Sequence, residues 1–342
     1  MEKHKILVTG GLGFIGSHTV VELQQAGYDV VIVDDLSNSQ LFILDRIKQI
    51  SGIAPVFYQL NMLEKEALEN LFANEKNISA VIHFAAFKAV GESVNEPIKY
   101  FHNNLCSLIH LLMCMEKYAV TNLVFSSSAT VYGAPEELPI KETTPFKKAI
   151  SSYGSTKQMG EEILEKTAAV KNITTIALRY FNPVGAHASG LIGELPLGIP
   201  NNLMPYITQT AAGIREQLVV YGNDYNTPDG TCIRDYIHVT DLAKAHVKSC
   251  DRLIQRLANE KYEVYNIGTG NGYSVLEIIN AFEQYNDLKL NYTIGTRRAG
   301  DAAAMYAAVS KAESYLHWKA ELGLKEMVTS AWHWQQKLTE AV

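Results

Sequence analysis

Cysteine is scarce in this chain of 342 residues: its four cysteines are Cys106, Cys114, Cys232 and Cys250, and none has Cys-x-x-Cys spacing. Neither a zinc site nor a disulfide framework is indicated, so we expect no metal and a reducing, cytoplasmic location. No apolar run approaches the roughly 20 residues that cross a bilayer. The chain passes from Met1 directly into a strand-like segment, so we expect neither a secretion signal nor a membrane partner.

An excess of basic charge is also missing. The formal net charge is -6, and lysines and arginines are scattered, with only short pairs such as Lys147-Lys148 and Arg297-Arg298. Because a nucleic-acid surface needs clustered positive charge, nucleic acid is not an expected partner. The hydrophobic share of 47% and the charged share of 19% are ordinary, and they predict a globular protein with a well-buried core.

Short apolar or β-branched runs alternate along the chain with longer segments of helical period. The strand-like runs are Lys5 to Thr9, Val30 to Val33, Val56 to Leu60, Ala80 to Phe84, Asn122 to Ser126 and Thr174 to Arg179, and the helical segments include Ser17 to Gln25, Leu63 to Phe72, Ile98 to Tyr118 and Tyr153 to Val170. Strands separated by helices imply right-handed crossovers and a parallel sheet covered on both faces. The sequence therefore predicts a doubly wound α/β fold of the Rossmann type.

The composition of the chain changes after Phe181. From there, proline- and glycine-rich stretches such as Pro196 to Asn202 separate shorter predicted strands and helices. Loops of this kind over a scaffold usually form a lid or a substrate lobe. We predict a cofactor-binding domain over residues 1–181 and a smaller mixed α/β, substrate-binding domain over residues 182–342. The segment Val264 to Ile267 leaves open a return of the chain to the first lobe.

A glycine-rich turn lies between the first strand-like run and the first helical segment. Gly10, Gly13 and Gly16 have the spacing that allows a tight turn, close approach of a pyrophosphate, and helix–strand packing. The helix that follows supplies free N–H groups and a positive dipole end. Asp34 ends the second strand where an acid binds the adenosine ribose, and its charge repels a 2'-phosphate. NAD is therefore the predicted cofactor, rather than NADP, and Asp35 is interpreted as a turn residue.

Three downstream residues indicate chemistry beyond cofactor binding. Tyr153 and Lys157 are four apart on a helix and share a face, although this spacing alone is also common in surface pairs. A tyrosine with a pKa of about 10 needs a lowering of ~3 units, about 4 kcal/mol, to act as a base near neutrality. One ammonium at ~4 Å together with an oxidised nicotinamide supplies that much. Ser127 or Ser128 ends a strand and would hydrogen-bond the reacting hydroxyl, and Ser128 is preferred.

Taken together, these residues resemble the extended short-chain dehydrogenase/reductases, and within them the 4-epimerases of UDP-hexoses. The resemblance covers nearly the whole chain in separate blocks. These blocks are Val8-Thr9-Gly10-Gly11, His83-Phe84-Ala85-Ala86, Lys88-Ala89-Val90-Gly91-Glu92-Ser93, Ser126 to Gly133, Arg179 to Ala186, Asn201 to Tyr206, Arg234 to Val239, and Trp332-His333-Trp334-Gln335.

The resemblance implies an isomerase with tightly held NAD that converts UDP-galactose to UDP-glucose through a transient 4-keto sugar. Tyr153 would remove and return the proton of the 4-hydroxyl, and Lys157 would orient the nicotinamide ribose and tune the phenol. The sugar pocket would accept two orientations, so most of the affinity should come from the UDP end. A homodimer is also implied, formed by the helical segments Ile98 to Tyr118 and Tyr153 to Val170.

The resemblance also assigns binding residues one by one. The implied cofactor residues are Gly10, Gly13, Phe14, Ile15, Gly16, Asp34, Asn38, Asn61, Met62, Phe84, Ala85, Ala86, Lys88, Asn103, Ser128, Tyr153, Lys157 and Tyr180. The implied substrate residues are Lys88, Ser128, Tyr153, Asn182, Asn202, Leu203, Tyr221, Arg234, Arg298, Asp301 and Met305. Within the second set, the two arginines would clamp the diphosphate, because guanidinium groups match phosphate oxygens bidentately.

Plainer interpretations stay open for several of these residues. Asn61 and Asn103 suit a turn and a helix cap, and Arg234 suits a structural pair with Asp235. Lys88 and Arg298 equally suit solvated surface charges.

The chain also departs from the family pattern. Asn61 replaces the usual aspartate, and Ser107 replaces a glycine. At the sugar gate a tyrosine restricts the site to plain hexoses and a small residue admits N-acetyl sugars, so Met305 leaves open a UDP-N-acetylglucosamine 4-epimerase or an enzyme with both specificities.

Three rival functions remain. A dehydratase needs an acid/base pair where Ala129-Thr130 stands, and a reductase often uses NADP, which Asp34 disfavours. A noncatalytic NAD sensor would not need Ser128, Tyr153 and Lys157 together.

Overall fold

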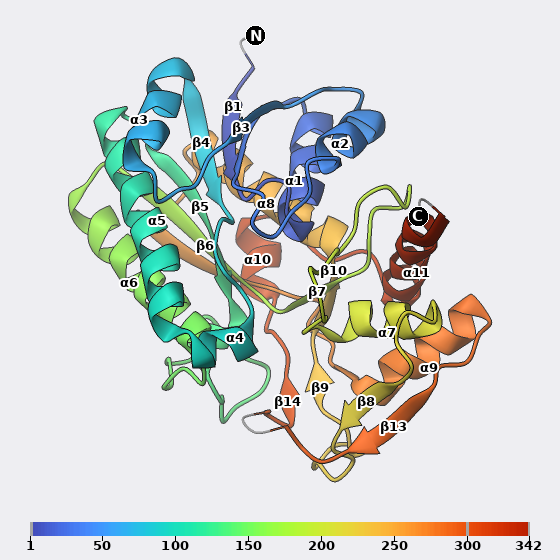
Figure 1. Cartoon of the computed structure of the whole chain (residues 1–342). Helices are drawn as coiled ribbons and strands as arrows, with labels where there is room; N and C mark the ends of the chain where they lie inside the picture. The colour runs from blue at the N-terminus through green and yellow to red at the C-terminus, as the bar shows by residue number, and fades with distance from the viewer. Residues whose placement is uncertain (1–2, 299–300, 341–342) are drawn as a thin grey trace.

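The computed structural model describes residues 3–298 and 301–340. Its centre is a sheet of seven parallel strands in the order β11-β6-β5-β4-β1-β2-β3 (Figure 1). The strands of this sheet are β1 (Lys5–Thr9), β2 (Asp29–Asp34), β3 (Val56–Gln59), β4 (Ile78–His83), β5 (Asn122–Ser128), β6 (Thr174–Tyr180) and β11 (Tyr262–Ile267). The doubly wound prediction is confirmed, since the strands are parallel and helices connect them.

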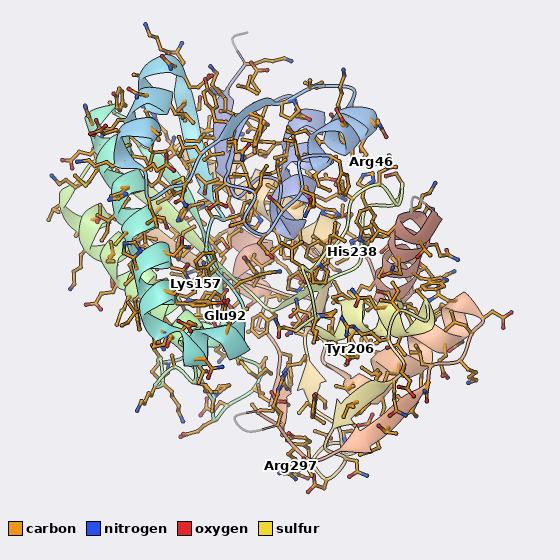
Figure 2. All side chains as sticks on the ribbon, in the orientation of Figure 1. Arg46, Glu92, Lys157, Tyr206, His238 and Arg297 are labelled. Atoms are coloured by element: carbon orange, nitrogen blue, oxygen red, sulfur yellow. The ribbon has the colours of Figure 1, made fainter. Side chains whose placement is uncertain are left out.

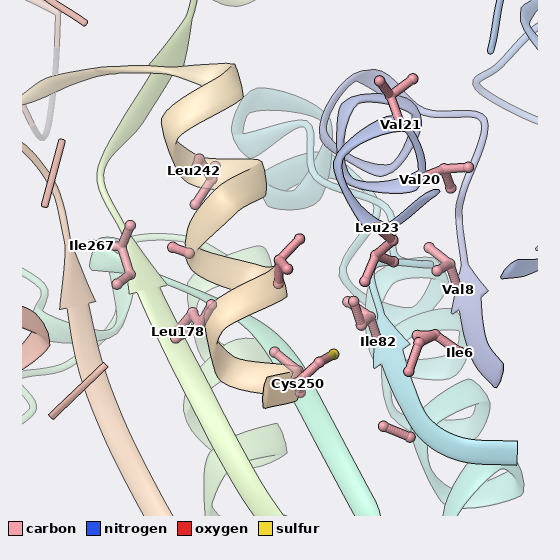
Figure 3. Packing of buried hydrophobic residues seen from close by; sticks show 14 of the residues in the cluster. Ile6, Val8, Val20, Val21, Leu23, Ile82, Leu178, Leu242, Cys250 and Ile267 are labelled. Carbon is pink, nitrogen blue, oxygen red and sulfur yellow. The ribbon is translucent and has the colours of Figure 1, made fainter. Parts of the chain in front are cut away.

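Successive side chains along each strand point to opposite faces of the sheet, so the sheet has one hydrophobic core on each face. On β1, Ile6 and Val8 belong to one hydrophobic cluster and Leu7 belongs to the other. Figure 3 shows the first cluster, with Leu242 and Cys250 on α8 and Leu23 on α1 packed over the strands. Strands buried on both faces read as continuous apolar runs, which is why these segments are recognisable in the sequence.

Helices cover both faces of the sheet. On the face of the first cluster lie α1 (Phe14–Gln25), α2 (Ile43–Ser51), α8 (Val239–Ile254) and α10 (Ser310–Tyr315), and on the opposite face lie α3 (Lys65–Asn74), α5 (Pro97–Lys117) and α6 (Ser152–Val170), with α4 (Val90–Asn95) beside α5 and α6 (Figure 1). A 3-10 helix, η1 (Ala129–Tyr132), follows β5. Within the described ranges, no helix combines the length and the hydropathy that crossing a bilayer requires.

Part of the chain beyond residue 181 belongs to this sheet. β11, which contains Val264 to Ile267, pairs in parallel with β6, so it forms an edge of the seven-stranded sheet. The preceding helix, α8, packs on α1 and against the strands. The first core is therefore assembled from segments that lie far apart in the sequence.

The remaining chain forms a smaller lobe of short strands and helices. Its helices are α7 (Leu203–Ala211), α9 (Val275–Asn286) and α11 (Leu324–Glu340), and its short sheets pair β7 (Asn182–Val184) with β10 (Tyr236–His238), β8 (Leu218–Tyr221) with β13 (Tyr292–Gly295), and β9 (Ile233–Arg234) with both β12 (Tyr273–Ser274) and β14 (Ala304–Met305). A separate core that includes Met204, Ile207, Phe282 and Met327 holds this lobe together. The carboxyl ends of the long strands point toward it (Figure 1).

Candidate active site

The glycine turn joins β1 to α1 and approaches the end of β4. Gly10 has a φ of +68°, and a Cβ on it would lie 2.9 Å from the backbone nitrogen of Ala85, so glycine alone fits here. A Cβ on Gly16 would lie 2.2 Å from the Gly10 carbonyl oxygen. Gly13 is the N-cap of α1 and gives no side-chain cap to the first N–H groups, which begin at Phe14. Backbone donors and a positive helix end therefore face the position of a pyrophosphate, and the turn fits NAD.

Asp34 ends β2 and is tied to the glycine turn. Its Oδ2 accepts a hydrogen bond from the backbone nitrogen of Leu12 at 3.0 Å. Its Oδ1 accepts from the backbone nitrogen of Leu36 at 3.0 Å and from the hydroxyl of Ser39 at 2.7 Å. Burial raises the pKa of Asp34 and outweighs these bonds, which lower it. Lone pairs remain for ribose hydroxyls. Asp35 accepts a hydrogen bond from a backbone N–H two residues on, as expected of a turn residue.

The candidates for the adenosine end lie on loops after β2 and β3. Asn38 is exposed, and Met62 is buried with 6% exposure. The side-chain oxygen of Asn61 accepts a hydrogen bond from the backbone nitrogen of Leu63 at 2.9 Å, which is the geometry of a turn residue. The turn interpretation of Asn61 is therefore correct, and its contact with adenine stays a prediction.

The candidates for the nicotinamide end follow β4 and β6. They are Phe84, Ala85, Ala86 and Lys88 on the loop after β4, Asn103 on α5, and Tyr180 at the end of β6. The rings of Phe84 and Tyr180 both pack on His246, with centroids 4.7 and 6.2 Å away. Asn103 lies in the interior of α5 and donates to the side-chain oxygen of Asn104 at 3.0 Å, so the helix-cap interpretation of Asn103 is wrong.

The structure brings Ser128, Tyr153 and Lys157 together, and we call these three residues the catalytic cluster. Ser128 is the last residue of β5, and the other two lie one turn apart at the start of α6. The Ser128 side chain is close enough to that of Tyr153 to lower its pKa. Lys157 Nζ lies 5.8 Å from the centroid of the Tyr153 ring and donates to the carbonyl oxygen of Ser126 at 2.7 Å. Figure 2 labels Lys157 in the large lobe, near the label of Glu92 in this view.

Burial controls the acidity of this cluster. It raises the pKa of Tyr153 to about 12, and the nearby Ser128 opposes the rise. Burial also lowers the pKa of Lys157 to about 8. Lys157 alone does not lower the pKa of the phenol as its proximity suggested, because its ammonium donates to Ser126 and lies over the ring face. Tyr153 is therefore protonated at neutral pH in this structure.

A second group of residues meets on the smaller lobe, and we call Tyr221, Arg234, Arg298 and Asp301 the nucleotide end. Arg234 Nη2 lies 3.5 Å and Arg298 Nη2 3.1 Å from Asp301 Oδ1. The Arg298 guanidinium lies over the ring of Tyr221, 5.8 Å from its centroid. The interpretation of Arg234 as a partner of Asp235 is wrong, because the Asp235 carboxylate accepts from backbone N–H groups of two other loops.

The other substrate candidates come from loops and short elements of both lobes. Asn182 begins β7, Leu203 begins α7, and Met305 ends β14 in register with Arg234. Lys88 and Asn202 both contact one carboxylate oxygen of Glu194, at 3.4 and 2.7 Å. Glu194 thus links a loop of the large sheet to the start of α7. The Lys88 side chain is 47% exposed, so its interpretation as a surface charge stays open beside its assignment to the site.

Comparison with known proteins supports the arrangement that the geometry describes. Residues 6–268, more than half of the chain, match the NAD dependent epimerase/dehydratase family. The chain belongs to this family. It is 53% identical over 331 residues to UDP-glucose 4-epimerase of Bacillus subtilis, with 96% of each chain covered. It is 51% identical over 332 residues to UDP-glucose 4-epimerase of Dictyostelium discoideum, covering 97% of this chain and 95% of the relative.

Solved structures show the same likeness for this member of the NAD dependent epimerase/dehydratase family. UDP-glucose-4-epimerase from Stenotrophomonas maltophila, with bound NAD and formylated UDP-arabinopyranose, superposes with a TM-score of 0.96 at 47% identity, over 99% of this chain and 100% of the other. The enzyme from Bifidobacterium longum, in complex with NAD+ and UDP, has a TM-score of 0.93 at 50% identity over 99% and 100% of the two chains.

Two site residues of this epimerase/dehydratase family member were missed by reasoning from the sequence. Glu194 lies in an irregular loop, and nothing local in the sequence marks it. Glu161 lies one helical turn after Lys157, and that spacing was an available signal. Glu194 pairs with Lys88 of the candidate site, and Glu161 pairs with Arg179 on the neighbouring strand β6.

Proposed function

We propose that this protein interconverts UDP-galactose and UDP-glucose by NAD-dependent epimerisation at C4. The observation that carries the proposal is the catalytic cluster at the carboxyl end of β5, in the same parallel sheet as β1 and its glycine turn, with the nucleotide end on the smaller lobe. A base and a diphosphate clamp on opposite lobes are what a sugar nucleotide requires. High identity to UDP-glucose 4-epimerases over nearly the whole chain supports the same reaction.

In this proposal Tyr153 moves the proton of the sugar 4-hydroxyl in both directions. Its phenol starts protonated, with a pKa raised to about 12, so it must be made more acidic before it can accept that proton. Ser128 already acts in that direction. The positive charge of an oxidised nicotinamide would add to it when NAD is bound, since Lys157 alone does not lower this pKa. NAD, when bound, supplies the acceptor and the donor of hydride at C4. The proton and the hydride both return, so no net redox change occurs.

The nucleotide end supplies affinity that does not depend on the orientation of the sugar. Arg234 and Arg298 offer guanidinium forks to the diphosphate, and Tyr221, 50% exposed, offers a ring face to the uracil. Asp301 holds both arginines and is placed to meet the uridine ribose. Because these contacts stop at the diphosphate, the hexose can turn over within the site.

Dehydration is less favoured by the same residues. η1 begins with Ala129 and Thr130, directly after Ser128. The side-chain oxygen of Thr130 is buried and, among the described residues, has no hydrogen-bond partner. A hydroxyl and a methyl group cannot act as the carboxylic acid/base pair that expels water.

The assay incubates purified protein with UDP-galactose and, separately, with UDP-N-acetylgalactosamine, without added NAD, and resolves the C4 epimers. We expect UDP-glucose from the first sugar. Product from the second sugar alone would overturn the preferred substrate. Product from both sugars would mean that the pocket beside Met305 accepts both plain and N-acetylated hexoses. Loss of water from either sugar would identify a dehydratase instead.

We also infer a homodimer in the cytoplasm. Exposed apolar residues on α5 and α6 include Ile98 at 81%, Ile109, Met113, Met159 and Val170 at 77%. The helices are adjacent, so two copies could form a four-helix bundle. The four cysteines are all unpaired, which suits a reducing compartment. Sedimentation of the wild type and of Met113→Glu tests the dimer, and identical monomeric behaviour would contradict it.

A further inference from the structure

A buried carboxylate stands directly behind the catalytic cluster. Glu161 is 3% exposed and lies one turn after Lys157 on α6, on the same face of the helix. Arg179 on β6 donates to it from Nε at 2.9 Å and from Nη2 at 2.6 Å. The hydroxyls of Ser127 on β5 and Tyr262 on β11 also donate to it. Glu161 is thus held on α6 by three neighbouring strands.

These donors fix the position of Glu161. Five hydrogen bonds from a guanidinium and two hydroxyls hold its carboxylate in place. They also keep it from turning toward Lys157, whose ammonium donates to the carbonyl oxygen of Ser126. Glu161 therefore acts on Lys157 through its electric field and not through a direct hydrogen bond.

Lys157 is buried, so a nearby negative charge is required to keep its ammonium group protonated. It is 4% exposed, and an ammonium that is buried without a counter-charge tends to lose its proton. Burial lowers the pKa of Lys157 to about 8, and the attraction of Glu161 raises it toward its usual range. Without Glu161 the pKa of Lys157 would fall further, toward neutral pH.

The other groups around Lys157 do not replace this anion. His83 on β4 has its pKa lowered to about 3 by burial and by Lys157, so it stays neutral. Tyr180 on β6 and Tyr153 on α6 have raised pKa values and stay protonated. Phe125 on β5 offers only its ring face, 4.9 Å from Nζ.

We propose that Glu161, anchored by Arg179, is a positioning residue that keeps Lys157 protonated and in place beside Tyr153. The proposal rests on the proposed function for the role of Lys157. Its electrostatic part concerns the free protein and can be measured without turnover.

The chain contains a matched control for the structural effect of such a pair. Arg252 Nε lies 2.7 Å from Glu263 Oε2, both side chains are less than 10% exposed, and Tyr265 donates to the same carboxylate. This pair joins α8 to β11 and has no lysine of the catalytic cluster beside it. Glu263→Gln should therefore cost comparable stability and leave Lys157 unchanged.

The first test titrates the Lys157 ammonium by NMR in protein with isotope-labelled lysine, with Lys157→Arg used to assign its signal. We expect Glu161→Gln to lower the pKa of Lys157 by about one unit or more. Glu263→Gln should leave it where it is. If Glu161→Gln does not fold, the double change Glu161→Gln with Arg179→Met removes both buried charges and should lower the pKa as well. An unchanged pKa in the folded variant would overturn the proposal.

The second readout is the pH dependence of kcat for UDP-galactose epimerisation. Activity that needs protonated Lys157 is lost as pH rises through its pKa, so Glu161→Gln should move the alkaline limb to lower pH by about the same interval. Glu263→Gln should leave that limb in place. A wild type without epimerase activity would reject the proposed function, whereas the NMR titration would still decide the role of Glu161.

Discussion

The catalytic cluster and the nucleotide end are built in opposite ways. Ser128, Tyr153 and Lys157 are 8%, 8% and 4% exposed, and they stand on a long strand and a helix of 19 residues. At the nucleotide end, Arg298 has a side chain that is 59% exposed, and Arg234 lies on a strand of two residues. Packing in the hydrophobic core fixes the catalytic cluster, whereas ion pairs with Asp301 hold the two arginines of the nucleotide end.

This difference in burial and rigidity matches the two proposed tasks, which are proton transfer in the catalytic cluster and substrate binding at the nucleotide end. A proton donor must be placed within hydrogen-bond reach of one atom, so it benefits from a rigid, buried position. A diphosphate clamp can rely on charge and on guanidinium forks, which tolerate small movements. Changes in the catalytic cluster should therefore reduce kcat, and changes at the nucleotide end should mainly raise KM.

The largest effect should follow from Tyr153→Phe. This change removes the hydroxyl that we propose takes and returns the proton, and it leaves the ring packing in place. We expect kcat to fall by about 10³-fold or more, with little change in KM for UDP-galactose. NAD content, read from the absorbance of released cofactor, should equal that of the wild type.

Tyr100→Phe is a matched control for that change. Tyr100 on α5 is also buried, with 0% exposure, but it is not part of the catalytic cluster. Its hydroxyl donates a hydrogen bond to the carboxylate of Glu92 at 2.7 Å. The control variant should therefore lose stability more than it loses kcat. Turnover of Tyr153→Phe comparable to that of Tyr100→Phe would remove Tyr153 from its proposed role.

A smaller effect, of the opposite kind, should follow from Arg298→Met. Loss of one charge-assisted fork should raise KM for UDP-galactose, and Kd for UDP, by about 10- to 100-fold, with kcat nearly unchanged. Arg297→Met is the adjacent control, because Arg297 pairs with Asp224 at 2.6 Å and is not assigned to substrate. Equal effects of the two changes, measured by steady-state kinetics and calorimetry with UDP, would show that Arg298 acts only as surface charge.

The same contrast explains what could be predicted from the sequence. Gly10, Gly13 and Gly16 and the pair of Tyr153 and Lys157 are close in sequence, so their geometry follows from local rules for turns and helices. The parallel sheet followed from apolar runs, and α2 (Ile43–Ser51) fills a gap between two strands, although it was not among the helical segments named from the sequence.

Contacts between distant segments were harder to predict. The pairing of β9 with β14, which sets Arg234 beside Met305, joins segments about seventy residues apart without a local signal. Glu194 was missed for the same reason. The raised pKa of Tyr153 depends on burial by many segments at once, which spacing on one helix cannot reveal.

The smallest effect concerns the stability of the buried region at mildly acidic pH. His18 on α1 is 1% exposed; burial lowers its pKa to about 3, and nearby His187 and His238 act in the same direction. An unfolded histidine has a pKa of about 6.5, so between these values the unfolded chain binds a proton that the folded chain does not. Stability is therefore fully present above about pH 6.5 and decreases as pH falls toward 3.

His18→Gln removes this one titrating group and so measures the contribution of His18 to the pH dependence of the unfolding free energy. Between pH 7 and pH 5.5 the wild type should lose about 1 kcal/mol of unfolding free energy through His18, and the variant should lose less by that amount. Urea unfolding followed by circular dichroism at the two pH values measures the difference. Parallel losses in both proteins would mean that burial does not keep His18 neutral, and that water reaches the interior around α1 as it reaches the exposed nucleotide end.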